Sequence, residues 1–171
     1  MPEHGGRYGQ PNPKAAPELA RFAFLIGAWG CEAKLKREDG TWDDLRATWE
    51  GRYILDGYAI ADDFRMTTLR GELLVLGVNL RAYDAQQQAW NMKWLNALAG
   101  TWVDLGAAEM GGVRAEGKSL SYCMKEPVAG HAFTRATYTA VASDHFTWRG
   151  ERSEEGERWE EFLVIEAHRR E

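Results

Sequence analysis

The chain has 171 residues, 44% of them hydrophobic and 27% charged, and its formal net charge is −5. This length and composition are typical of one globular domain with its own apolar core. The acidic balance argues against a nucleic-acid binder, which needs a basic surface, and no apolar run reaches the length of a membrane span.

The first apolar run begins at Phe22, so the sequence predicts no signal peptide and a cytoplasmic protein. In a reducing compartment, Cys31 and Cys123 are expected to be free, buried thiols. Residues 1–16 are rich in glycine and proline and are expected to form a flexible surface arm. The barrel domain is expected to span residues 17–171.

A short helix is predicted over Pro17–Ile26. Pro17 and Glu18 are typical of a helix start, and the apolar residues that follow have helical spacing. Gly27 ends this helix, and Trp29 begins an alternating segment.

From Ala28 onward, turn signals such as Glu38-Asp39-Gly40 recur at intervals typical of strands. They separate the segments Ala28–Arg37, Trp42–Tyr53, Tyr58–Thr67, Leu73–Asp84, Ala89–Asn96, Thr101–Glu109, Val113–Gly117, Lys118–Met124, Ala132–Val141, His145–Glu151 and Arg158–His168. Pro127–Gly130 is expected to be a loop. About ten antiparallel strands with short loops predict an all-β, up-and-down barrel with a capping helix, because closure removes exposed edges. A β-sandwich is the alternative.

The chain resembles the DUF1579-type family, a bacterial family of unknown function with a lipocalin-like (calycin superfamily) barrel. The resemblance covers about Phe22 to Trp94 and rests on Phe24-Leu25-Ile26-Gly27-Ala28-Trp29, Trp49–Tyr58, Asp62-Asp63-Phe64-Arg65, Leu80–Asp84 and Trp90-Asn91-Met92-Lys93-Trp94. It implies that the helix covers one barrel end and that Trp29 fills the space beneath it. It implies no catalytic residues, since none are agreed for the family.

The sequence lacks the motifs of the common hydrolases, kinases and nicotinamide-dependent oxidoreductases. No histidine or cysteine pair has metal-ligand spacing, so no metal site is expected. Some barrels of similar shape, the nitrobindin-like ones, bind haem. For a haem-binding barrel, His145 and His168 are the candidate ligands.

Asp62 and Arg81 are the candidate catalytic pair. Each lies among apolar neighbours on its strand, and the two strands are consecutive, so the side chains are expected to meet. A buried carboxylate needs such a partner. The two residues therefore form either a structural ion pair or an anion or carbonyl clamp by Arg81, with Asp62 as its orienter or as a general base. Outward-facing, solvated side chains are the remaining alternative.

The candidate ligand-binding residues are mostly aromatic and are expected to face one cavity: Tyr58, Asn79, Tyr83, Trp90 and Trp94. Eight tryptophans in the chain fit an aromatic pocket, although they also fit a plain core. The sequence therefore predicts binding of a small apolar or aromatic molecule, with no organic cofactor. The alternatives are a cofactor-independent cyclase, isomerase or lyase of small-molecule metabolism, the haem-binding barrel, and an interaction module with a filled barrel. A homodimer is compatible with all of them.

Overall fold

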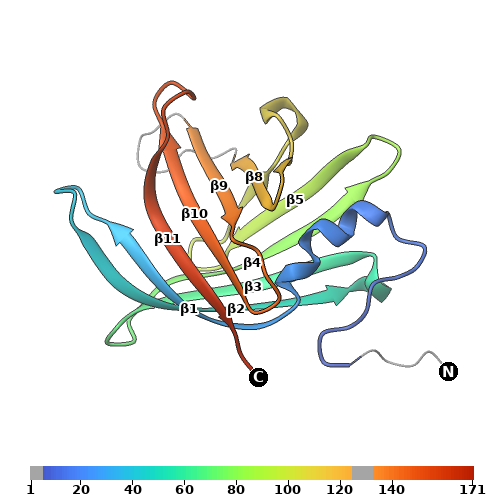
Figure 1. The fold of residues 1–171 in the computed structure, drawn as a ribbon, viewed down its shortest axis with the longest axis horizontal. Coiled ribbons are helices and arrows are strands. Elements are labelled where there is room, and N and C mark those ends of the chain that lie inside the picture. Colours follow the sequence, from blue (N-terminus) through green and yellow to red (C-terminus); the bar gives the residue numbers. More distant parts are fainter. Residues whose placement is uncertain (1–5, 125–132) are drawn as a thin grey trace.

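The computed structural model describes residues 6–124 and 133–171 (Figure 1). The predicted loop Pro127–Gly130, together with His4 and His131, lies outside these residues. The elements are η1 (Pro17–Leu25), β1 (Gly27–Lys36), β2 (Trp42–Ile54), η2 (Leu55–Gly57), β3 (Ala59–Thr68), β4 (Leu73–Asp84), β5 (Ala89–Asn96), β6 (Thr101–Leu105), η3 (Ala108–Met110), β7 (Arg114–Glu116), β8 (Ser119–Met124), β9 (Phe133–Thr139), β10 (His145–Ser153) and β11 (Glu160–Arg169).

Within the described residues, ten antiparallel strands close into a barrel, as the turn pattern predicts. The strands follow the order β6-β5-β4-β3-β2-β1-β11-β10-β9-β8, and pairing of Leu105 with Met124 joins β6 to β8. The short strand β7 is an extra strand that pairs with β8 alone. Because the sheet closes on itself, its long strands have no free edge.

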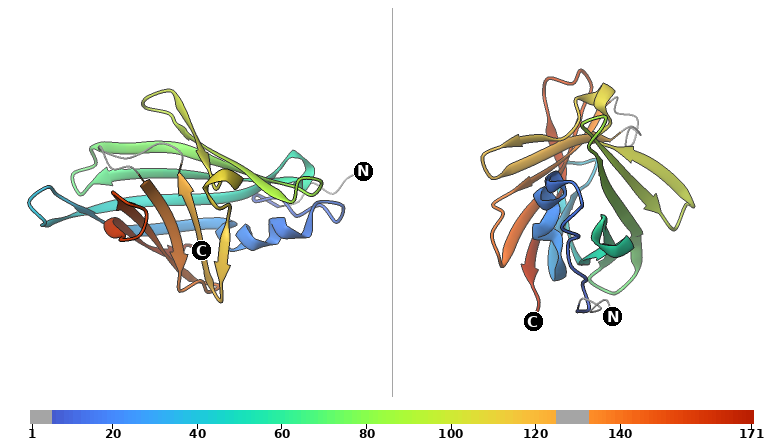
Figure 2. Two further views of the ribbon diagram at one scale, coloured as in Figure 1. Left: turned by 90° about the horizontal axis from the view of Figure 1, so that it is seen from above. Right: turned by 90° about the vertical axis from the view of Figure 1, so that its right-hand side faces the viewer.

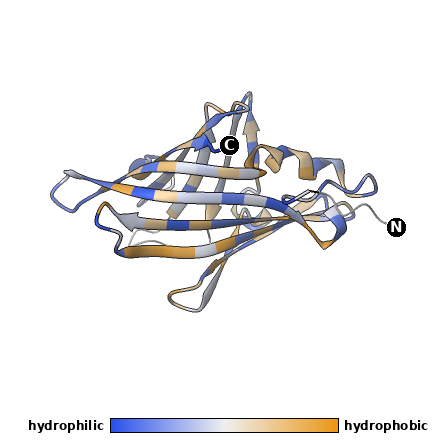
Figure 3. Ribbon diagram, turned by 90° about the horizontal axis from the view of Figure 1, so that it is seen from below, coloured by the Kyte–Doolittle hydropathy of each residue, from blue (hydrophilic) through white to orange (hydrophobic). Residues whose placement is uncertain are grey.

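Alternate residues of each strand point into the barrel. On β1 the inward set begins with Trp29 and Cys31, and on β3 it includes Ile60 and Asp62. On β4 the inward positions carry the polar residues, and four aliphatic residues, Leu74, Leu76, Val78 and Leu80, alternate on the outer side. The barrel wall seen from below accordingly mixes hydrophilic and hydrophobic segments (Figure 3).

The predicted capping helix is the 3₁₀ helix η1, which lies across one end of the barrel (Figure 2, right). Its Leu19, Phe22 and Leu25 side chains are buried in the core. The helix end lies directly against β2 at Gly51, where a Cβ atom would stand 2.2 Å from the Leu25 carbonyl oxygen. Only glycine permits that approach.

Trp29 lies beneath η1, as the resemblance implies. Its side chain is 1% exposed, and its indole Nε1 donates a hydrogen bond to the Leu25 carbonyl, 3.0 Å away. The ring packs edge-on against Phe146 of β10, with 4.8 Å between centroids. Trp29 therefore fills the covered end and links the helix to β1 and β10.

The arm that precedes η1 lies along the β2–β3 connection. The backbone amide of Tyr53 donates to the Tyr8 carbonyl at 2.8 Å, and the amide of Asn12 donates to the Gly57 carbonyl at 3.1 Å. These bonds fix residues 8–12 against the barrel. Among the described residues, no helix is both long and apolar enough to cross a bilayer.

Candidate functional site

Asp62 and Arg81 form the buried ion pair that the sequence predicts. They come from the neighbouring strands β3 and β4, where Asp62 pairs in register with Asn79, two residues before Arg81. The Arg81 Nε donates to Asp62 Oδ1 at 2.7 Å, and Nη2 donates to Oδ2 at 3.2 Å. Both side chains are 0% exposed, so the charges depend on each other for solvation.

Two further side chains donate hydrogen bonds to the Asp62 carboxylate. Asn79 Nδ2 donates to Asp62 Oδ2 at 2.7 Å, and the indole Nε1 of Trp49 donates to the same oxygen at 2.8 Å. With the two bonds from Arg81, the carboxylate accepts four hydrogen bonds.

Two tyrosines surround the guanidinium of Arg81 from the opposite wall. Arg81 Nη2 donates to the hydroxyl of Tyr138 at 3.1 Å, and the hydroxyl oxygens of Tyr122 and Tyr138 lie 3.2 Å apart. The ring of Phe22 covers the guanidinium at 4.5 Å, a cation–π distance. We call Trp49, Asp62, Asn79, Arg81, Tyr122 and Tyr138 the polar layer, because together they span the barrel interior.

The electrostatics of the polar layer favour a fixed charge on Arg81. Burial by itself would lower the pKa of Arg81, but Asp62 and the two tyrosine hydroxyls raise it well above its ordinary value. Burial raises the pKa of Tyr138 well above its ordinary value, although Arg81 opposes that shift. Arg81 therefore stays charged and Tyr138 stays protonated through the neutral range.

A second site, which we call the end cavity, opens beside η1 with a volume of about 350 Å³. Tyr83 and Trp90 line it from β4 and β5, and their rings meet edge-on with 5.2 Å between centroids. Trp90 is in turn held edge-on by Phe22 of η1 at 5.0 Å. The aromatic lining is thus fixed on two strands and the helix.

Polar side chains enter the end cavity from two directions. Arg21 on η1 and Gln88 in the β4–β5 turn both line it. Arg21 is exposed and makes no ion pair with any other described residue. The cavity therefore combines aromatic surface with a cation that has no acidic partner, as small-molecule sites commonly do.

The predicted ligand-binding residues do not all come together. Tyr83 and Trp90 line the end cavity, whereas Asn79 belongs to the polar layer. Trp94 is half-buried and lies against Gly77, where a Cβ atom would stand 2.4 Å from its ring. Trp90 and Trp94 share a face of β5, but Met92 separates them, and it is Trp90 that packs against Phe22 of the helix.

Tyr58 lies outside the barrel interior, in contrast to its predicted place in the pocket. Its side chain is 48% exposed. The short 3₁₀ turn Leu55–Gly57 precedes it, and β3 begins only at Ala59, so the strand alternation does not extend to Tyr58.

The two candidate haem ligands lie on the outer face of the barrel. His145 and His168 are paired across β10 and β11, and their ring centroids are 4.9 Å apart. His145 Nε2 is hydrogen-bonded to Glu166 at 2.8 Å. The next residue on β10, Phe146, is fully buried, so the histidines point away from the interior. No group of three metal-ligating side chains occurs in the described part of the chain.

Sequence reasoning did not single out the tyrosines of the polar layer or Arg21 of the end cavity. Tyr122 lies on the same buried face of β8 as Leu120, and Tyr138 lies on the same buried face of β9 as Ala136. Strand alternation places both inside the barrel. Their contact with Arg81 depends on strands more than 40 residues away in the chain, which no local pattern reports.

Comparisons with known proteins support the barrel. The structure of Rv2717c from M. tuberculosis is similar over 92% of this chain and 99% of that one, with a TM-score of 0.64 and 12% identity. The S-type phycobiliprotein lyase CPES from Guillardia theta is similar over 88% of this chain and 90% of that one, with a TM-score of 0.56 and 9% identity.

At such low identities, these likenesses show a shared fold alone. No known family model matches the sequence, and no curated protein matches it. The ten-stranded barrel fold is therefore supported, and the lipocalin-like and DUF1579 assignments stay predictions.

Proposed function

We propose that this protein binds a small aromatic or apolar molecule in the end cavity. The observation that carries the proposal is that aromatic walls lie beside a cation, Arg21, which has no acidic partner among the described residues. Tyr83 and Trp90 supply flat apolar surface, and Arg21 is available to a polar substituent of the ligand. The volume of about 350 Å³ lies within the range of small-molecule pockets.

The similar structures give this proposal general support. One of them is named as a phycobiliprotein lyase, which makes a ligand-handling role for such a barrel reasonable. At 9% identity that role does not transfer residue by residue. The proposal therefore depends on the cavity.

Turnover is the alternative, in which Asp62 and Arg81 would act on the bound molecule without a cofactor. Both side chains are fully buried, and the carboxylate already accepts four hydrogen bonds. A substrate could reach them only if the polar layer opened. This is why binding is the leading function and catalysis the second.

Intrinsic tryptophan fluorescence tests the proposal, with a panel of indole, naphthol, terpenoid and polyketide-like compounds and haem. We expect saturable quenching by at least one aromatic compound, and loss of that quenching in Trp90→Leu. Trp102→Leu is the matched control, because Trp102 is 53% exposed on β6 and lies outside the end cavity. Quenching that survives in Trp90→Leu but disappears in Trp102→Leu would contradict the proposal.

The same panel separates binding from catalysis. If a panel compound is consumed, and Asp62→Asn abolishes consumption while the quenching constant is unchanged, the protein is an enzyme. Consumption that continues in Asp62→Asn would exclude the catalytic role of that residue.

A further inference from the structure

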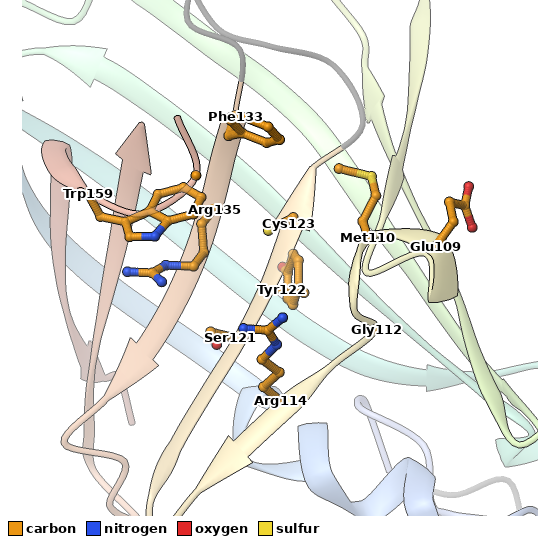
Figure 4. A pocket seen from close by; sticks show the side chains of 11 residues that line it. Glu109, Met110, Gly112, Arg114, Ser121, Tyr122, Cys123, Phe133, Arg135 and Trp159 are labelled. Carbon is orange, nitrogen blue, oxygen red and sulfur yellow. The ribbon is translucent and has the colours of Figure 1, made fainter. Parts of the chain in front are cut away.

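A cavity distinct from the end cavity lies on the outside of the barrel, over β8 and β9 (Figure 4). Its volume is about 280 Å³. We call it the outer cavity and define it by Arg114, Ser121, Cys123, Phe133, Arg135 and Trp159. It shares only Gly112 with the end cavity, so the two sites lie on different sides of the β6–β7 connection.

Strand alternation places these side chains outside the barrel. On β8, Leu120 and Tyr122 are buried in the core, so Ser121 and Cys123 face outward. Ser121 pairs with Arg114 of β7, and Cys123 pairs with Arg135 of β9. The outward residues of three adjacent strands thus form the floor of one cavity.

The two arginines of the outer cavity differ in whether they already form an ion pair. Arg135 Nε donates to Glu151 at 2.8 Å, and its guanidinium lies 4.1 Å from the centre of the Trp159 ring. Arg114 is exposed and makes no ion pair with another described residue. Glu109 of η3 is also a lining residue of the cavity. Arg114 is therefore the cation that a bound anion would meet without competition from a paired acid.

The thiol of Cys123 is not a negatively charged partner for Arg114. Burial raises the pKa of its thiol, and the two neighbouring arginines only partly oppose the shift. The thiol is consequently neutral at pH 7. Phe133 and Met110 add apolar surface to the walls.

We propose that the outer cavity binds a small aromatic carboxylate. The carboxylate pairs with the guanidinium of Arg114, the planar geometry that arginine recognises best. The hydroxyl of Ser121, in register with Arg114, is placed to donate to the same group. The ring lies between Phe133 and Met110. At about 280 Å³, the space suits a ligand below drug size. This site does not depend on the end cavity.

Cys123 provides a reporter for the site. Cys31 is buried in the core, and its thiol pKa is raised to about 12, so a neutral alkylating reagent reacts with Cys123 first in the folded protein. Iodoacetamide labelling of Cys123 is followed by mass spectrometry, with benzoate, phenylacetate or indole-3-acetate as the competing probe. We expect at least one of the three carboxylates to slow labelling about fivefold or more at saturation. The matching amide should leave the rate unchanged.

Arg114→Gln tests the recognition itself. Arg114 is exposed, so the variant is expected to fold. Its labelling rate without ligand should be lower than that of the parent, because Arg114 no longer opposes the raised pKa of Cys123. Protection is therefore scored as the ratio of rates with and without carboxylate in each protein, and the apparent affinity for the carboxylate should fall about tenfold or more in the variant. Arg65→Gln, on the outer face of β3, is the control and should retain protection.

Three results would overturn the proposal: no protection by any of the three carboxylates, equal protection by an amide, or protection that survives unchanged in Arg114→Gln. The part of the fluorescence quenching that is lost in Trp90→Leu is a separate readout of the end cavity, because Trp159 lines the outer cavity. Failure of one site is thereby distinguished from failure of the other.

Discussion

The polar layer and the end cavity are built from similar residues. They differ in whether the charged and polar side chains are already bonded to each other. In the polar layer, an arginine, a carboxylate and aromatic rings are fully buried and bonded to each other. In the end cavity, Arg21, Tyr83 and Trp90 meet at a solvent-connected space, and the arginine has no acidic partner. The comparison shows that buried charge by itself indicates structure. The exposed charge of Arg21 beside accessible aromatic surface is the basis of the proposed binding site.

The largest expected effect comes from breaking the polar layer. Arg81→Ala leaves Asp62 buried without its counter-ion, which should lower the free energy of unfolding by about 3–5 kcal/mol. Urea denaturation at pH 7 measures the loss. Arg65→Ala, on the outer side of β3, should change stability by less than about 0.5 kcal/mol. A loss below about 1 kcal/mol in Arg81→Ala would mean that the layer is not a structural unit.

Removing Trp29 should have an effect of similar size for a different reason. Trp29→Ala leaves a large cavity beneath η1 and should cost about 3–5 kcal/mol. Thermal unfolding checks this, with Trp102→Ala as the exposed tryptophan control. If the two variants melt at the same temperature, the covered end does not depend on Trp29.

Alkaline pH should destabilise the barrel by a smaller amount, through Cys31. Burial raises its thiol pKa from 9.0 to about 12 in the folded protein, against a smaller opposing effect of Arg170. The stability that comes from the protonated thiol is complete below pH 9 and is lost as the pH rises toward 12, by about 1.4 kcal/mol per unit for this group. Tyr138 acts in the same direction above its ordinary pKa of 10.

Urea midpoints between pH 7 and pH 11 measure this loss. The Cys31→Ala variant should show a shallower decline above pH 9 than the parent, because one of the titrating groups is gone. Equal declines in parent and variant would show that the Cys31 thiol ionises freely in the folded state.

The smallest effect on stability is expected at the end cavity. Arg21→Gln breaks no ion pair, so the free energy of unfolding should change by less than about 0.5 kcal/mol. The affinity for a panel compound with a polar substituent should nevertheless fall, while an unsubstituted aromatic compound should bind as before. A large loss of stability would mean that Arg21 has a structural contact.

Local patterns predicted most of the fold. Turn residues and alternation placed the strands, and the hairpin order brought Asp62 beside Arg81, because consecutive strands pair. The strand expected over Thr101–Glu109 is wrong beyond Leu105: Gly106 has a positive φ of 61°, and η3 follows. Tyr58 was misplaced because a 3₁₀ turn interrupts the alternation.

Contacts across the barrel lay beyond sequence reasoning. Tyr138 meets Arg81 only because closure brings β9 opposite β4. Arg21 reaches the end cavity only because η1 folds across the barrel end. Such contacts follow from the assembled topology, which local patterns in the sequence do not reveal.

The most direct test compares one tyrosine from each region in the same binding experiment. Quenching by 2-naphthol is titrated in the parent, in Tyr83→Leu and in Tyr138→Phe, which removes only the hydroxyl group from the polar layer. We predict that Tyr83→Leu weakens binding about tenfold or more, and that Tyr138→Phe binds like the parent while its unfolding midpoint falls. Binding that is unchanged in Tyr83→Leu and lost in Tyr138→Phe would place the ligand in the polar layer and contradict the assignment of the end cavity.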